Sequence, residues 1–173
     1  MSTLSLSASW PLNQNWSLRG GVGLIQDGTL SPTNGAVQDV KPGGLMALGF
    51  EYVWQPGQGF KPTVDFSVFL SASATHTEDR LTKNRASYFS SDLRIGGRAS
   101  WIINGKIFPY VSGRLFGGPV SWEIDGIDVT GTDIHHYQIA FGTAIQVGQI
   151  VPFVEWAGIG EKAISAGLSY SWR

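Results

Sequence analysis

The sequence predicts an all-β protein built as an antiparallel, up-and-down barrel. Two observations predict it: apolar and small polar residues alternate with a period of two along most of the 173 residues, and helical periodicity is almost absent. Clusters of Gly, Pro, Asn and Asp separate the alternating segments, as turns require. No pattern divides the chain, so residues 1–173 are expected to form a single domain.

Nine segments alternate in this way, and their connections differ in length. The predicted strands are 2–10, 16–26, 44–55, 62–75, 87–103, 106–122, 135–148, 150–159 and 163–172. Short connections follow most odd-numbered strands, whereas long loops are expected at 27–43, 76–87 and 123–134. Tight turns at one end and long loops at the other are typical of outer-membrane barrels, so a transmembrane barrel is expected.

Composition indicates which face of the barrel points outward. Charged residues are 14% of the chain, against about 25% in ordinary domains, so the small polar face lacks the Lys and Glu of a soluble surface. The large apolar face is therefore expected to meet lipid. A net charge of −1 without a basic cluster argues against a nucleic-acid partner. The absence of Cys excludes disulfides and thiolate sites, and no segment resembles a transmembrane helix or a signal peptide.

The few charges on the small polar face balance one another, which predicts an ion-paired network that largely plugs a narrow lumen. Its expected members are Arg19, Glu51, Asp65, Asp92, Arg94, Arg98, Arg114 and Glu155. Aromatic residues gather near the ends of the predicted strands, as they do at membrane interfaces. The expected interface aromatics are Trp10, Trp16, Trp54, Trp101 and Trp172 at the short-turn end, and Trp122 and Tyr137 at the other end.

The last segment, ISAGLSYSW at 164–172, resembles the closing strand of Gram-negative outer-membrane β-barrels, a superfamily that includes small porin-like and opacity-type barrels. Its alternation and terminal aromatic are similar to the signal read by the barrel assembly machinery. That aromatic is usually a final Phe, whereas here Trp172 is followed by Arg173. The resemblance implies a monomer in the bacterial outer membrane that contacts lipid and lipopolysaccharide, and it implies no particular activity or cofactor.

Barrels of this superfamily have even strand numbers, so nine strands conflict with the resemblance. Two explanations stay open. Either a further N-terminal strand belongs to the barrel, giving a ten-strand parent, which we favour, or one segment does not span. The weakest segment is 150–159, which is short and contains Pro152. The expected count is therefore eight to ten strands.

One group of residues suggests chemistry. Asp133 and His136 lie near the top of the seventh strand, and Glu155 is on the eighth, so an acid/base set of an outer-leaflet hydrolase is conceivable. Adjacent residues of a strand point to opposite faces, however, so only one of His135 and His136 can face the lumen. We expect no metal site, because three His residues at this spacing match no dedicated motif.

The reading that we favour is a non-enzymatic outer-membrane barrel with a structural or surface-interaction role. The alternatives are a narrow channel for ions or small solutes, an outer-leaflet lipid or peptide hydrolase, and a soluble ligand-binding barrel.

Overall fold

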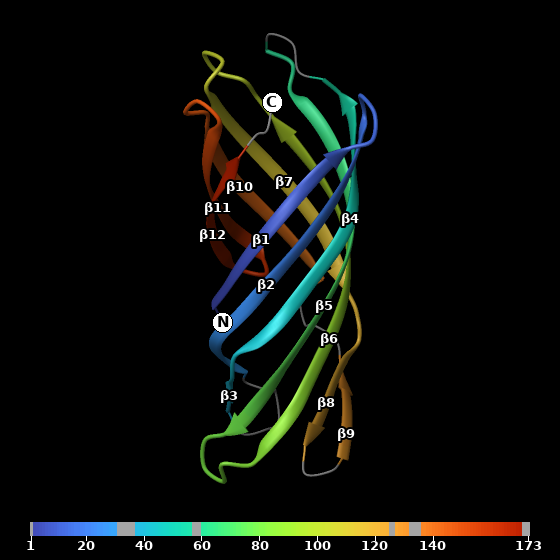
Figure 1. The fold of residues 1–173 in the computed structure, drawn as a ribbon, viewed down its shortest axis with the longest axis vertical. Coiled ribbons are helices and arrows are strands. Elements are labelled where there is room, and N and C mark those ends of the chain that lie inside the picture. Colours follow the sequence, from blue (N-terminus) through green and yellow to red (C-terminus); the bar gives the residue numbers. More distant parts are fainter. Residues whose placement is uncertain (1, 31–36, 57–59, 125–126, 132–135, 171–173) are drawn as a thin grey trace.

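The computed structural model describes residues 2–30, 37–56, 60–124, 127–131 and 136–170, and these form one antiparallel sheet that curves into a barrel-like shape (Figure 1). The strands are β1 (Ser2–Pro11), β2 (Trp16–Leu30), β3 (Gln38–Val40), β4 (Gly43–Gln55), β5 (Thr63–Asp79), β6 (Arg85–Ser100), β7 (Ile107–Gly117), β8 (Val120–Ile124), β9 (Ile127–Gly131), β10 (Tyr137–Ile145), β11 (Ile150–Gly160) and β12 (Ala163–Tyr170). The described residues contain no helix long and apolar enough to cross a membrane. The all-β, antiparallel prediction is confirmed.

Chain neighbours pair in order around the sheet. Around its middle the order is β1, β2, β4, β5, β6, β7, β10, β11 and β12, with every pair antiparallel. These nine strands correspond to the nine alternating segments of the sequence. We call the part of the sheet that they form the barrel section.

Tight turns join the strands at one end of the barrel section. Asn104 and Gly105 both have positive φ, 51° and 66°, which is the conformation of a two-residue turn that matches the twist of the flanking strands. Gly148, at φ 65°, serves the connection between β10 and β11 in the same way. The short turns predicted at these two places are therefore explained by residues that tolerate positive φ.

The opposite end differs from the prediction, because the expected long loops are partly strands. β5 continues to Asp79 and β6 begins at Arg85, so the expected loop 76–87 is a long hairpin. The Asp79 carboxylate accepts hydrogen bonds from the backbone N–H groups of Leu81 and Thr82, at 2.7 and 2.8 Å, and thereby closes the turn. The sequence did not reveal this continuation, since its alternation there involves Thr and charged residues rather than large apolar ones.

The other two expected loops also contain strands. β3 lies inside the predicted loop 27–43 and pairs with both β2 and β5. The predicted sixth strand divides at Gly118 and Pro119 into β7 and β8, and β8 pairs with β6 and with β9, inside the predicted loop 123–134. Pro119 has no N–H for a ladder, while its carbonyl accepts a hydrogen bond from Ser91 N–H at 3.1 Å. The tips of these segments lie outside the described residues.

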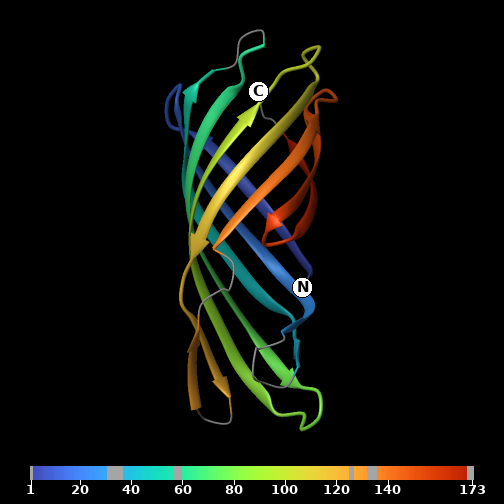
Figure 2. The same cartoon turned by 180° about the vertical axis from the view of Figure 1, so that it is seen from behind.

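The continued strands project beyond the barrel section as a second region, seen below β7 and β10 from behind (Figure 2). We call this region the extension. It consists of β3, β8, β9, residues 75–79 of β5 and 85–88 of β6, with the turn 80–84 between them.

Segment 150–159, the weakest of the predicted strands, is a strand of the sheet in the structure. β11 is a regular strand that pairs with β10 over seven positions of its partner, Gln138 to Ala144, and with β12 along eight of its own residues. Pro152 is tolerated opposite Leu168. The two edges of the sheet are β1 and β12, and among the described residues no ladder joins them. Both edge strands run toward the short-turn end, so they are parallel to each other (Figure 1).

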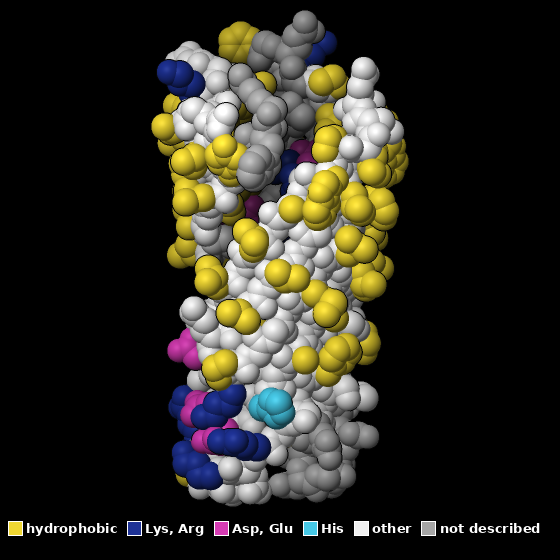
Figure 3. All heavy atoms as spheres, in the orientation of Figure 1, with side chains coloured by type: hydrophobic (Ala, Val, Ile, Leu, Met, Phe, Trp, Pro, Cys, Tyr) yellow, Lys and Arg dark blue, Asp and Glu magenta, His cyan; other side chains and the backbone are white. Residues whose placement is uncertain are grey.

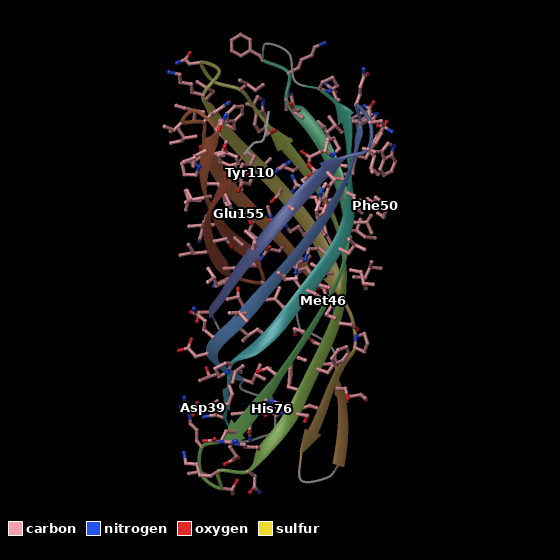
Figure 4. The ribbon with its side chains drawn as sticks, viewed as in Figure 1. Asp39, Met46, Phe50, His76, Tyr110 and Glu155 are labelled. Carbon is pink, nitrogen blue, oxygen red and sulfur yellow. The ribbon has the colours of Figure 1, made fainter. Side chains whose placement is uncertain are left out.

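The two faces of the barrel section have opposite chemistry. Large apolar residues project outward, among them Met46 and Phe50, which point away from the sheet in Figure 4. Small residues on the inner face leave room for rings from the next strand: a Cβ on Gly49 would lie 2.4 Å from the Phe69 ring, and one on Gly142 would lie 2.3 Å from that of Tyr110. The small residues of the inner face thus leave space for aromatic side chains that point into the barrel section.

Candidate functional site

The charged residues of the inner face form the candidate site. Around Glu51, two guanidinium groups meet two carboxylates. Arg98 donates to Asp65 Oδ2 through Nε and to Glu51 Oε1 through Nη2, both at 3.0 Å. Arg19 Nε lies 2.7 Å from Glu51 Oε2, an ion-pair distance, although its N–H is not aligned for a hydrogen bond. Glu51 and Asp65 are buried, so this first cluster joins β2, β4, β5 and β6 across the inner face.

A second cluster joins β7, β10 and β11. Arg114 makes a two-pronged contact with Glu155, at 2.7 and 2.8 Å, and Nη1 of the same guanidinium donates to Gln138 at 2.9 Å. Two parallel bonds between a guanidinium and a carboxylate fix the orientation of both groups. Figure 4 shows Glu155 and Tyr110 on the inside of the barrel section. The Arg98 guanidinium lies 5.9 Å from the centre of the Tyr110 ring, which links the two clusters.

The last predicted pair is looser. Arg94 Nη2 is 3.4 Å from Asp92 Oδ2, two residues away on the same strand, and its guanidinium lies 5.6 Å from the centre of the buried Phe116 ring. The eight predicted lumen residues therefore all take part in ion pairs on the inner face. Four of them are basic and four acidic, so the face carries charge without a net sign.

The hypothetical acid/base set is not assembled around Glu155. Its carboxylate is held by Arg114, and its strand partner is Gly142. His136 is exposed and lies six residues further along the neighbouring strand, about 20 Å away at the usual rise per residue. Asp133 and His135 lie outside the described residues. No group of three His, Cys, Asp or Glu side chains that could hold a metal ion occurs within the described part of the chain.

The predicted interface aromatics fall into two groups. Trp10, Trp16, Trp54 and Tyr137 are between 44% and 61% exposed, and Trp101 is half-buried. Trp172 lies outside the described residues. Trp122 contradicts the prediction, because it is 8% exposed and its indole N–H donates to Thr77 Oγ1 at 2.9 Å. It fills the inside of the extension rather than facing outward.

The interior of the extension is a second packed region, which the alternation of large apolar residues does not predict. Trp122 packs edge-on against Tyr88 with ring centres 6.1 Å apart. Thr77 of β5 and Val40 of β3 are buried as well. One sequence pattern does indicate the continuation of β5: Thr75 and Thr77 occupy the same alternate positions as the inward-facing Asp65. Continuing the alternation past the last large apolar residue would have predicted the longer strands.

The outside of the extension was missed as well. Lys41, Lys83 and Arg85 surround the carboxylate of Glu78, with nitrogen–oxygen distances of 3.3, 3.9 and 3.5 Å. Arg80 pairs with Asp39 at 2.7 Å nearby. These groups appear as a mixed blue and magenta patch at the lower end of Figure 3, while yellow apolar side chains cover the barrel section above.

No known protein family matches the chain, and no curated protein or solved structure matches it either.

Proposed function

We propose that the protein is an integral outer-membrane β-barrel, with the barrel section in the bilayer and the extension outside it. It acts without catalysis, in a structural or surface-interaction role, and its partners are membrane lipid, including lipopolysaccharide, and the barrel assembly machinery during insertion. It functions as a monomer. Charged and aromatic side chains largely plug its lumen.

The observation that carries this proposal is a reversal of polarity along single strands. The outward face of β5 bears Phe66, Val68 and Leu70 and then, beyond two Ala residues, His76 and Glu78. The inward face of the same strand begins with the ion-paired Asp65 and ends with the buried Thr77, which contacts Trp122. Apolar outside and charged inside is the pattern of a barrel in lipid, whereas the opposite pattern suits water.

A soluble ligand-binding barrel would need the apolar face inside. In the barrel section, Leu48, Leu70 and Leu93 stand in one row across three strands, and they are 56%, 61% and 49% exposed. Apolar residues exposed in continuous rows form a surface far larger than soluble monomers usually tolerate. Lipid is the environment that removes this conflict.

The experiment that tests the membrane assignment is refolding in detergent followed by gel electrophoresis with and without heating. A compact barrel is expected to migrate differently before and after boiling, and refolding should require detergent micelles or vesicles. A monomer that stays soluble and folded in plain buffer would overturn the proposal.

Plugging is supported by the two clusters that cross the inner face and by the rings over Gly49 and Gly142. Nevertheless, the Arg19 and Arg94 side chains are 40% and 45% exposed although they lie on the inner face, and this observation favours a narrow channel as the second candidate function. Planar-bilayer recordings separate the two functions. A plugged barrel should give no resolved unitary conductance, whereas regular steps would identify a channel.

We also retain the ten-strand parent as part of the proposal. In hydrocarbon, unpaired N–H and C=O groups along β1 and β12 each cost several kcal/mol, so both edges require partners. A single further strand would be antiparallel to both edges. It would separate them by about 10 Å, twice the usual spacing of paired strands.

Cross-linking distinguishes this arrangement from direct parallel pairing of β1 with β12. The chain contains no Cys, so cysteine pairs that combine Ser5, Ser7 or Ser9 with Ser165 or Ser169 have no background. We expect a linker of about 10 Å to join them in vesicles, with no spontaneous disulfide, because disulfides need Cα atoms within about 7 Å. Spontaneous disulfides would show that β1 and β12 pair directly and would remove the tenth strand.

A further inference from the structure

The cations on the outer face of the extension lie on the same side of the sheet as the exposed apolar side chains of the barrel section. Glu78 is opposite Arg85 in the register of β5 and β6, and Ala74 is opposite Phe89. Arg85 and Phe89 share the outward face of β6, four residues or about 13 Å apart along the strand. If the apolar surface lies in hydrocarbon, as proposed above, the cations stand at the depth of the lipid headgroups.

Within this patch the basic groups form the outer layer. The Glu78 side chain is 15% exposed, while those of Lys41, Lys83 and Arg85 are 39%, 68% and 76% exposed. These three cations come from the β3–β4 connection, the 80–84 turn and the start of β6, so the fold gathers them from three segments. An approaching group meets the cations first, and the carboxylate beneath holds them together.

The charges around Glu78 do not cancel. Three cations share the one carboxylate of Glu78, and a hydrogen bond from Lys41 lowers the pKa of Glu78 below its ordinary value, so that it remains a fixed anion. Of the other nearby acids, Asp39 is paired with Arg80, and Asp79, which accepts hydrogen bonds from the turn and from Gln38, remains a second anion. Three cations against the carboxylates of Glu78 and Asp79 leave a surplus of one positive charge, which is available to an external anion.

We propose that Lys41, Lys83 and Arg85 bind the phosphate group of a membrane lipid headgroup at this end of the barrel. A phosphate offers several acceptor oxygens to ammonium and guanidinium donors, and cations next to an anionic membrane surface each contribute roughly a fivefold gain in affinity. The source is the lipid rather than free phosphate, because the acyl chains of a bound lipid continue along the apolar surface that begins at Phe89. This inference rests on the membrane location proposed above.

The test uses the full chain refolded in a neutral detergent and titrated with short-chain phosphatidic acid, with bound lipid counted by native mass spectrometry. The variant Lys83→Gln/Arg85→Gln should bind about 25-fold more weakly than the parent protein. Its matched control is Lys61→Gln/Lys106→Gln, which removes two exposed lysines at the short-turn end and should leave the affinity within about twofold.

Equal losses in the two variants, or no loss in either, would overturn the headgroup site. Equal binding of short-chain phosphatidylcholine would also overturn it, and displacement of phosphatidic acid by low millimolar inorganic phosphate would replace the lipid by free phosphate as the ligand. Heat-modifiable migration of all three proteins, measured on the same samples, tests the membrane barrel separately. Its presence with unchanged lipid affinity means that only the headgroup site fails.

Discussion

The barrel section and the extension share strands β5 and β6, yet they are built in opposite ways. In the barrel section the inner face holds Arg98 and Glu51, and the outer face holds residues such as Leu70. In the extension the inside holds Trp122, and the outside holds Glu78 and Arg85. The backbone geometry is continuous across the change, so the sheet itself does not decide which face is apolar. Under the proposed membrane location, the surroundings of each region decide it, and the reversal marks the boundary between lipid and water.

Removing the centre of the extension should have the largest effect. Trp122→Ala deletes a buried ring and its bond to Thr77, a change that costs about 3–5 kcal/mol in a packed interior. If the two regions are stabilised independently, the extension should become sensitive to protease while the barrel section keeps its heat-modifiable migration. Loss of both together would show that the regions fold as one unit.

The second largest effect is expected from a charge placed on the outer face, which should destabilise the barrel section but not the extension. Leu70→Arg introduces a cation into the apolar surface and is expected to destabilise the folded protein by about 2–4 kcal/mol in vesicles. Ser87→Arg makes a similar change on the outer side of the extension, where it should stay within about 0.5 kcal/mol. Urea unfolding in vesicles measures both variants, and equal destabilisation would contradict a boundary between two media.

The loss of stability on removing an inner carboxylate should depend on how many cations that carboxylate contacts. Glu51→Gln leaves Arg19 and Arg98 without their common carboxylate, and we expect a loss of about 1–3 kcal/mol. Asp92→Asn affects the single, 3.4 Å contact with Arg94 and should cost less than about 1 kcal/mol. Unfolding in denaturant compares them. A larger loss for Asp92→Asn would mean that the cluster around Glu51 does not stabilise the barrel.

Acid should have the smallest effect, and it should act on the extension. Backbone hydrogen bonds from Thr82 and Leu81 lower the pKa of Asp79 below its ordinary value of 3.8. A lowered pKa in the folded state means that the turn is fully stabilised above pH 3.8 and loses this stabilisation as the pH falls through the folded pKa. Amide exchange in residues 80–84 should therefore accelerate only below pH 3.8. Asp79→Asn should remove that pH dependence.

Much of the barrel section could be predicted from the sequence because its two faces differ so strongly in size and polarity. The alternation of Leu48, Phe50 and their neighbours gave the orientation of the strand, and the balance of Arg and Asp or Glu pointed to pairing on the inner face. Which Arg meets which carboxylate could not be predicted, since it depends on the register between strands. Glu51 of β4 forms ion pairs with Arg19 of β2 and Arg98 of β6, and β6 is two strands away from β4.

The extension was harder to predict for a physical reason. Its strands are short of large apolar residues, and an alternation of polar residues such as His76, Thr77 and Glu78 resembles a loop when only hydrophobicity is considered. The burial of Trp122 depends on β8 folding back along β6 after the break at Pro119. The separation of His136 and Glu155 was also beyond a sequence-based prediction, because it depends on the register that places Gly142 opposite Glu155.

Because the nine strands of the barrel section alternate in direction, Ser2 and Tyr170 lie at opposite ends of it. Ser2 begins β1 at the end that carries the extension, and Tyr170 ends β12 at the end with the tight turns (Figure 1). Under the proposed membrane location, Ser2 and Tyr170 themselves would face different aqueous compartments of a sealed vesicle. A membrane-impermeant quencher would reach a reporter at only one of these two positions, so the pair would report the orientation of the inserted protein.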